Sequence, residues 1–190
     1  KIIFNPLELK FNIKTIGSSL IKQKKIIEIE SIKTQIPLSS LFAEKFLLKK
    51  LEISSKSLEI KNFVSFMRTF NNNAELFVLE KIVKKGFLII DINLDFDEKG
   101  KIKKNYKING FVKNSSVDIL NKYKIEKLNF VFNYEKNLLN LSDTSLSFNE
   151  LNLLSKNLSL KKNKNEIEIK GIIEGNKLNL NDQNINLFIK

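Results

Sequence analysis

A two-residue alternation of apolar and polar side chains recurs through the sequence and constrains the fold more than any other feature. Between Leu88 and Phe96 every second residue is apolar. The same alternation returns in segments that begin near Leu7, Leu128 and Ile167. Because successive side chains of a strand point to opposite faces, each segment predicts a strand with one apolar and one polar face. The sequence therefore predicts a mainly β protein.

Short polar turns separate these segments, which favours antiparallel pairing of sequential strands. The central turn is residues 97–100 (DEKG), where Gly100 supplies the positive φ of a type I turn with a bulge. The expected strands are residues 7–16, 26–35, 49–54, 57–61, 86–96, 101–113, 125–134, 138–147, 151–160, 166–175, 177–182 and 185–190. The predicted fold class is thus mainly β with a few short helices, in which a meander of amphipathic strands forms a long antiparallel, curled and groove-like sheet.

Two short helices are expected outside the centre of the chain. Pro37 suits the first turn of a helix over residues 38–44. Ser115 and Ser116 are suitable caps for a one- or two-turn helix over residues 117–123. The polar stretch 17–25 is expected to be a turn without a strand of its own.

The segment 62–85 departs from the strand alternation and has helical spacing. Its run 71–73 (NNN) divides it, so that Asn73 is expected to cap a second helix and Gly86 to end that helix in a left-handed conformation. A strand over residues 74–83 is the competing interpretation. No sharp change of composition marks a domain boundary. Residues 1–190 are therefore predicted to be one β-rich segment of a larger protein, with a possible joint at 62–85.

Composition removes most catalytic chemistry. Among 190 residues there is no Cys and no His, which excludes thiol nucleophiles, Ser–His pairs and most zinc or iron sites. The densest acidic group is Asp91, Asp95, Asp97 and Glu98, which has the oxygen ligands for a cation. Asp91 and Asp95 also fit the polar positions of a strand, and this interpretation is favoured. We therefore predict no enzyme activity, no metal and no cofactor.

The net charge of +12 comes from 33 basic and 21 acidic residues, an excess that can attract nucleic acid or an anionic membrane. Arg68 is the single Arg, whereas sites that read phosphates or bases use Arg heavily for its two-pronged geometry. The Lys clusters at 22–25 and 161–164 fall in expected turns. The charge is therefore interpreted as solvated surface, and no nucleic-acid partner is predicted.

No stretch approaches the roughly 20 apolar residues of a membrane helix. We expect any membrane anchor or signal to lie in a preceding segment of the parent protein.

The apolar face of such a sheet needs a cover, and three covers are physically distinct. One is a second sheet or the short helices, which gives a closed core and a structural or interaction domain. A second is the lipid bilayer around an outer-membrane barrel, although Trp is absent and Tyr is scarce here. The third is a bound lipid. Exposing an acyl chain costs about 0.8 kcal/mol per methylene, so a chain of ~16 carbons faces a barrier on the order of 13 kcal/mol without an apolar path.

The third interpretation predicts which side chains line the path. They are the apolar positions of the central hairpin and of the next long strand. The expected lining residues are Leu88, Ile90, Ile92, Leu94, Phe96, Tyr106, Ile108, Leu128, Phe130 and Phe132. Ordinary core packing is the alternative role for each of them.

Two stretches of sequence also resemble a known family. Residues 36–42 (IPLSSLF), followed by 51–53 (LEI) and 58–62 (LEIKN), resemble the opening repeat of bacterial AsmA-like proteins. Residues 85–87 (KGF), 95–101 (DFDEKGK) and 105–110 (NYKING) resemble hairpins of the same group. The likeness extends over most of the chain but rests on no diagnostic motif.

This resemblance implies a grooved β-sheet that carries phospholipid between membranes. AsmA-like proteins are thought to be anchored in the bacterial inner membrane, to cross the periplasm and to help deliver phospholipid to the outer membrane. The implied partners are phospholipid acyl chains, together with the inner membrane through a segment outside this sequence. The N-terminal membrane helix of the family is not found in the sequence, and the family has no catalytic residues to transfer.

Overall fold

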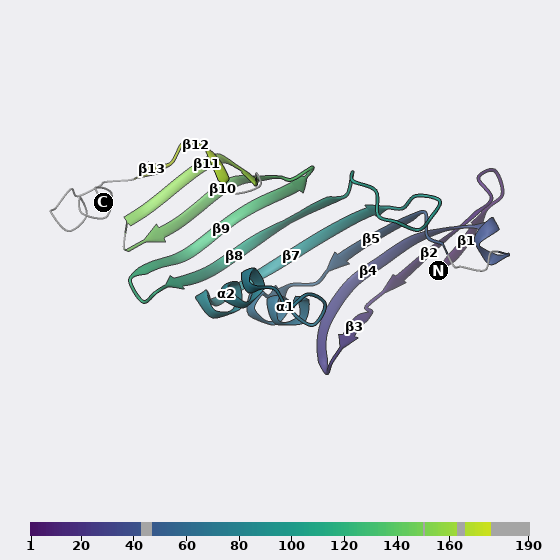
Figure 1. Cartoon of the computed structure of the whole chain (residues 1–190), viewed down its shortest axis with the longest axis horizontal. Coiled ribbons are helices and arrows are strands. Elements are labelled where there is room, and N and C mark those ends of the chain that lie inside the picture. The colour runs from purple at the N-terminus through teal and green to yellow at the C-terminus, as the bar shows by residue number, and fades with distance from the viewer. Residues whose placement is uncertain (43–46, 150, 163–165, 176–190) are drawn as a thin grey trace.

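The computed structural model of the chain describes residues 1–42, 47–149, 151–162 and 166–175, and it is dominated by one large antiparallel sheet (Figure 1). Along the sheet the order is β1 (Ile2–Asn5), β2 (Lys10–Ile16), β4 (Lys25–Pro37), β5 (Lys50–Ser55), β7 (Val83–Asp95), β8 (Lys107–Ile119), β9 (Tyr123–Glu135), β10 (Leu138–Phe148), β11 (Leu151–Lys162) and β12 (Ile167–Gly171). Within the described residues the sheet is not closed on itself. The predictions of a mainly β class and a large antiparallel sheet are confirmed.

Three short strands branch from this path. β3 (Ser19–Lys22) pairs with β4, β6 (Leu58–Glu59) pairs with β7, and β13 (Glu174–Gly175) pairs with β11. The strand β3 forms a hairpin with β4 inside the stretch 17–25, which the sequence predicted as a turn only. Only the central residues of this stretch, Gln23 and Lys24, turn the chain, and both have the positive φ that a tight hairpin requires.

The helices are inserted in the chain between β6 and β7. The helix α1 spans Ile60–Met67 and α2 spans Ala74–Ile82, and both lie beside the middle of the sheet in Figure 1. Asn73 caps α2 as predicted, since its Oδ1 accepts the backbone N–H of Leu76 at 2.8 Å, and the competing strand over 74–83 does not form. Because β5 pairs directly with β7, the sheet continues past the segment 62–85 without a break.

The end of α2 differs from the prediction. The helix stops at Val83, whose backbone N–H donates to the carbonyl of Leu79, and β7 begins at that same residue. Gly86 is therefore a residue of β7, not a helix cap, although its φ is +136°. A Cβ on Gly86 would lie 2.7 Å from the Cα of Ser115, so close contact between two strands is what requires glycine here.

The helix predicted over 117–123 is absent, and this prediction is wrong. β8 continues through Ile119, and Ser115 and Ser116 are buried within the strand. Asn114, with a φ of +51°, shifts the register of β8 against β9 so that the strand passes through a bulge and then resumes pairing. The short polar residues that suggested a helix cap thus belong to a strand irregularity.

Other boundaries also moved, and the strand expected over 101–113 begins only at Lys107. The strand expected over 7–16 begins at Lys10, because residues 6–9 form the turn between β1 and β2. The strand expected over 57–61 is shortened to β6, because α1 starts at Ile60. The helix expected over 38–44 is a 3₁₀ turn, η1 (Leu38–Leu41), and residues 43–46 lie outside the described part, as do the strands expected over 177–182 and 185–190.

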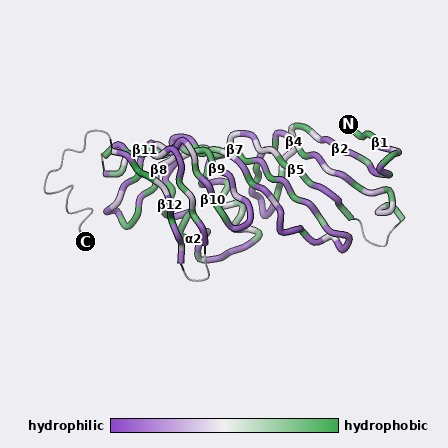
Figure 2. The backbone as a smooth tube through the Cα atoms, turned by 90° about the horizontal axis from the view of Figure 1, so that it is seen from above, coloured by the Kyte–Doolittle hydropathy of each residue, from purple (hydrophilic) through white to green (hydrophobic). Residues whose placement is uncertain are grey.

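Strand alternation makes one face of the sheet more apolar than the other, although the second face also aligns Ile89, Phe111 and Val131 across three strands. Cross-strand register aligns one apolar residue from each of eight strands into a continuous row, here called the apolar row: Ile32, Ile53, Ile92, Ile108, Tyr134, Leu139, Leu160 and Ile169. On the other side the adjacent positions Lys33, Glu52, Asn93, Lys107 and Glu135 are aligned in the same way. Figure 2 shows hydrophobic and hydrophilic segments alternating along the strands. The side that carries the apolar row is called the apolar face below, and the opposite side the polar face.

Candidate functional site

The apolar face is the candidate site, and the apolar row shows its extent. The row crosses from β4 to β12, and seven intervals at roughly 4.8 Å each give a length of about 34 Å. One leaflet of a bilayer provides about 15 Å of hydrocarbon, half of the ~30 Å core. An acyl chain laid across the strands would therefore be shorter than the row.

A second row lies beside the first on the same face, displaced from it by two residues in every strand. It contains Ile90, Gly110, Phe132, Leu141 and Leu158 in direct cross-strand register. A Cβ on Gly110 would lie 2.8 Å from Cζ of Phe132, so the aromatic ring occupies the space that a side chain would take. The missing side chain in β8 thus lets Phe132 cover the sheet beside Ile90.

The structure brings six of the ten predicted lining residues into one cluster. Leu88 and Ile90 are buried in it, and Ile92, Ile108, Phe130 and Phe132 pack against it half-buried. Leu94 is on the same face, opposite Leu51 in β5, and Leu128 is on that face opposite Ser115, beyond the bulge. Phe96 lies outside the long strands and forms a single bridge to Ile102. Tyr106 immediately precedes β8.

Tyr134, in the middle of the apolar row, and Tyr106, which precedes β8, bring two hydroxyls to the candidate site. Their ring centroids are 6.0 Å apart, and both side chains are half-buried. Hydrogen bonding with Tyr106, together with burial, raises the pKa of Tyr134 above its ordinary value, which favours its neutral hydroxyl. A neutral hydroxyl beside an apolar row can donate a hydrogen bond without introducing a charge.

The helix α1 covers the part of the apolar face beside β4, β6 and β7. Phe63 packs against both apolar clusters, and Ile60 packs against the cluster of Leu88, Ile90 and Val112. A neighbouring cluster of Ile27, Ile29, Leu58 and Phe66 lies at the β4 side of the helix. Here the sheet and the helix form a sealed core, in which Ile29 is 2% exposed and Phe66 is 3% exposed.

The apolar row beyond this helix is not sealed to the same degree. Leu139 and Leu160 are half-buried, and Ile169 at the β12 edge is 62% exposed. At the other edge, the rings of Phe4 and Phe11 are tilted against each other with centroids 5.0 Å apart, and Phe4 remains exposed. The apolar face therefore has a covered part under α1 and an uncovered part toward both ends of the sheet.

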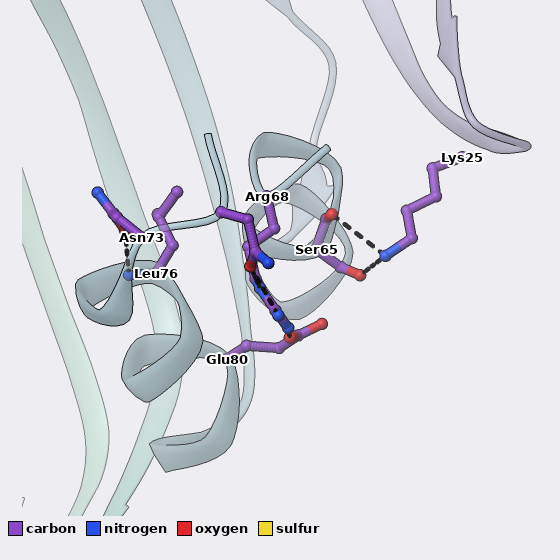
Figure 3. Close-up of polar contacts among 7 residues, drawn as sticks. Lys25, Ser65, Arg68, Asn73, Leu76 and Glu80 are labelled. Carbon is purple, nitrogen blue, oxygen red and sulfur yellow. Dashed lines mark hydrogen bonds and ion pairs between the residues drawn. The ribbon is translucent and has the colours of Figure 1, made fainter. Parts of the chain in front are cut away.

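Polar contacts fix the helices at their position on the sheet (Figure 3). Arg68, which follows α1, forms an ion pair with Glu80 of α2, and both side chains are mostly buried. Lys25 at the start of β4 donates to the hydroxyl and the backbone carbonyl of Ser65 in α1. These contacts join the two helices to each other and to the β3–β4 hairpin.

The polar face carries charge pairs both within a strand and between neighbouring strands. Glu52 accepts from Lys50 at 2.6 Å and lies 3.5 Å from Lys33, and these lysines lower the pKa of its carboxyl. Lys107 pairs with Glu135 at 3.2 Å on neighbouring strands. Such exposed pairs contribute little free energy each, but they keep this face hydrated.

No cluster of three or more potential metal ligands occurs among the described residues. Asp97, which the sequence placed in an acidic group, uses its Oδ1 to accept the backbone N–H groups of Lys99 and Lys101 in the hairpin turn. Its carboxylate therefore stabilises the turn. None of the helices in the described part of the chain is long and apolar enough to cross a membrane.

Sequence reasoning missed the cover supplied by α1. Phe63 and Phe66 were placed on a helix by their spacing, but nothing in the spacing showed which sheet face the helix would contact. Val112 was left out of the lining although it pairs with both Leu88 and Phe130. Its position in the alternation of β8, four residues after Ile108, is the signal that identifies it.

Comparison with known proteins identifies no relative from which a function can be transferred. No family model matches the sequence, and neither curated proteins nor solved structures give a match.

Proposed function

We propose that the apolar face binds lipid acyl chains and that the chain is a non-enzymatic, lipid-binding segment of a bacterial cell-envelope protein. The observation that carries this proposal is the uncovered part of the apolar row. Apolar residues in direct register on adjacent strands give a continuous path, and the half-buried state of Leu139 and Leu160 leaves the path accessible. Covering acyl methylenes along such a path recovers about 0.8 kcal/mol for each one removed from water.

Strand irregularities support a curled shape for the sheet. Asn114, Lys127 and Asp143 each have a φ of +51° and lie at register shifts in the neighbouring strands β8, β9 and β10. The side chain of Asn129 connects two of these bulges. Its Oδ1 accepts the N–H of Asn114 at 2.9 Å, and its amide donates to the carbonyl of Lys127. Bulges bend the strand that contains them and increase its twist. Bulges in adjacent strands favour a sheet that curls around an acyl chain.

The cellular setting is part of the same proposal. The resemblance of the sequence to AsmA-like proteins supports a periplasmic setting, in which a part of the parent protein outside this sequence would anchor the segment in the inner membrane. The cargo would be phospholipid destined for the outer membrane.

A structural or interaction domain with a closed core and no ligand is the second candidate. The observation that favours it is the sealed cluster under α1, where Leu88, Ile90 and Val112 are at most 9% exposed. On this interpretation, the uncovered part of the apolar row would be filled by protein.

Photocrosslinking tests the two candidates directly. A photoreactive amino acid at Ile92 or Leu141 probes the apolar face, and one at Asn140, which is exposed on the polar face of β10 between Asn133 and Ser159, is the matched control. Expressed in the parent protein in cells, the apolar-face positions should give lipid adducts and Asn140 should not. Adducts to protein alone, or equal lipid adducts from both faces, would reject the lipid path.

A further inference from the structure

A basic hollow lies on the polar face, away from the apolar row. It has a volume of about 450 Å³ and is formed where α1 begins, beside β6, the start of β7 and the bulges of β8 and β9. This volume falls in the range of small-molecule sites. Phe87, which is 48% exposed, contributes the apolar part of its wall. Because Phe87 and Leu88 are consecutive strand residues, the hollow and the apolar cluster are on opposite faces.

Four lysines and one glutamate line this hollow: Lys61, Lys84, Lys85, Lys127 and Glu59. None of the four lysines forms an ion pair within the described part of the chain, although lysines elsewhere on the sheet do. Glu59 is already engaged, since its carboxylate accepts the side-chain amide of Asn62 at 2.8 Å. The hollow therefore holds a formal charge of +3 that no facing carboxylate balances.

The backbone brings these charges together. Gly86 separates the bulged residues Lys84 and Lys85 from the regular part of β7, and the pairing with β8 shifts at this point. On β9, Lys127 has a left-handed backbone conformation and lies at the corresponding bulge. Bulges redirect side chains, and here they gather lysines from two strands that are not adjacent in the sheet.

We propose that this basic hollow binds a phosphate group, carried on a small headgroup or free in solution. The proposal does not depend on the lipid function of the apolar face. Lysine binds phosphate as a point charge, so several lysines around one hollow can replace the two-pronged geometry of arginine. Lys84 Nζ also donates to the carbonyl of Lys81 at 3.3 Å. A phosphate monoester with a charge near −2 neutralises most of the local excess, whereas a carboxylate neutralises one unit.

The test uses two glycine substitutions that change the charge equally. Lys127 and Lys136 both have a φ of +51°, a conformation that glycine adopts without strain, but only Lys127 lines the hollow. Lys127→Gly should therefore keep the fold while removing one binding charge, and Lys136→Gly is the matched control. Urea unfolding midpoints at or above the wild-type value would establish that both variants are folded.

Glycerol 3-phosphate is the soluble probe, titrated at low ionic strength while backbone amide resonances are followed by NMR. We expect shifts centred on residues 84–87, 114 and 127, and an affinity about fivefold lower in Lys127→Gly with less than a twofold change in Lys136→Gly. Vesicles that contain phosphatidic acid, whose headgroup is a phosphate monoester, provide the lipid-borne arm, and vesicles of phosphatidylglycerol, whose phosphodiester carries one charge, are the comparison. Stronger binding to phosphatidic acid, weakened only by Lys127→Gly, would assign the phosphate to a lipid headgroup. Equal losses in both variants, or no localised shifts with either probe, would overturn the proposal.

Discussion

The sheet has a covered region under α1 and an uncovered region over β10 and β11, and the two are built from the same alternating pattern. Leu88 and Ile90 in the covered region are at most 9% exposed, whereas Leu139 and Leu160 in the uncovered region are half-buried. The difference arises from α1, which is inserted between β6 and β7 and packs Ile60, Phe63 and Phe66 against the sheet, not from the strands themselves. Alternation therefore determines which face is apolar, but another element decides whether that face becomes a core or remains open.

Truncating isoleucines in the two regions gives the largest expected contrast. Ile29→Ala removes a side chain that is 2% exposed between the sheet and α1, and should lower the free energy of unfolding by about 2–5 kcal/mol. Ile169→Ala, on an edge strand where the side chain is 62% exposed, should cost under about 1 kcal/mol. Urea unfolding of both variants measures the difference. Equal losses would show that the uncovered region is packed as tightly as the core.

The sequence was sufficient to predict which face of the sheet is apolar, but not to predict which element covers that face. The strands β4, β5, β9, β10 and β11 were predicted close to their observed limits, because alternation is a local signal. The cap at Asn73 was also predicted, since it depends on residues within one helical turn. The helix expected over 117–123 was wrong, because the bulge at Asn114 is defined by its partner strand. The contact of Phe63 with the sheet likewise depends on tertiary packing, which no local pattern specifies.

Gly110 tests the boundary between the two regions. It lies between Ile90 and Phe132, and a Cβ would be 2.8 Å from the Phe132 ring and too close to the carbonyl of Ile89. Gly110→Ala should therefore destabilise the protein by about 1–3 kcal/mol through overpacking. In a Phe132→Leu background, Gly110→Ala should lower the free energy of unfolding by a smaller amount, because part of the steric clash is removed. An unchanged cost in that background would assign the whole effect to the backbone of β7.

The cap of α2 tests how strongly the covered region depends on its helices. Asn73→Ala removes the acceptor for the N–H of Leu76 and should cost about 1 kcal/mol, whereas Asn73→Asp keeps an acceptor and should be nearly neutral. Amide hydrogen exchange locates the effect. We expect faster exchange in α2, which has no buried side chain, and little change in β10 and β11. Faster exchange throughout the sheet would mean that the uncovered region also depends on the helices.

The ion pair between Arg68 and Glu80 gives the smallest expected effect and a defined pH dependence. Hydrogen bonds from Arg68 and then Ser65 lower the pKa of the Glu80 carboxyl, so the pair stabilises the fold at pH values above the ordinary glutamate pKa of about 4.3. That contribution is lost as the pH falls through the lowered pKa of the folded state. Glu80→Gln should therefore lower the free energy of unfolding by about 1 kcal/mol or less at pH 7, and the difference in stability from wild type should vanish in strong acid.

Urea unfolding midpoints of both proteins across this pH range provide the measurement. Glu28→Gln is the control, because Glu28 pairs with Lys56 in an exposed position. A Glu80→Gln difference that persists in strong acid would mean that Glu80 stabilises the helices by packing and not by its charge.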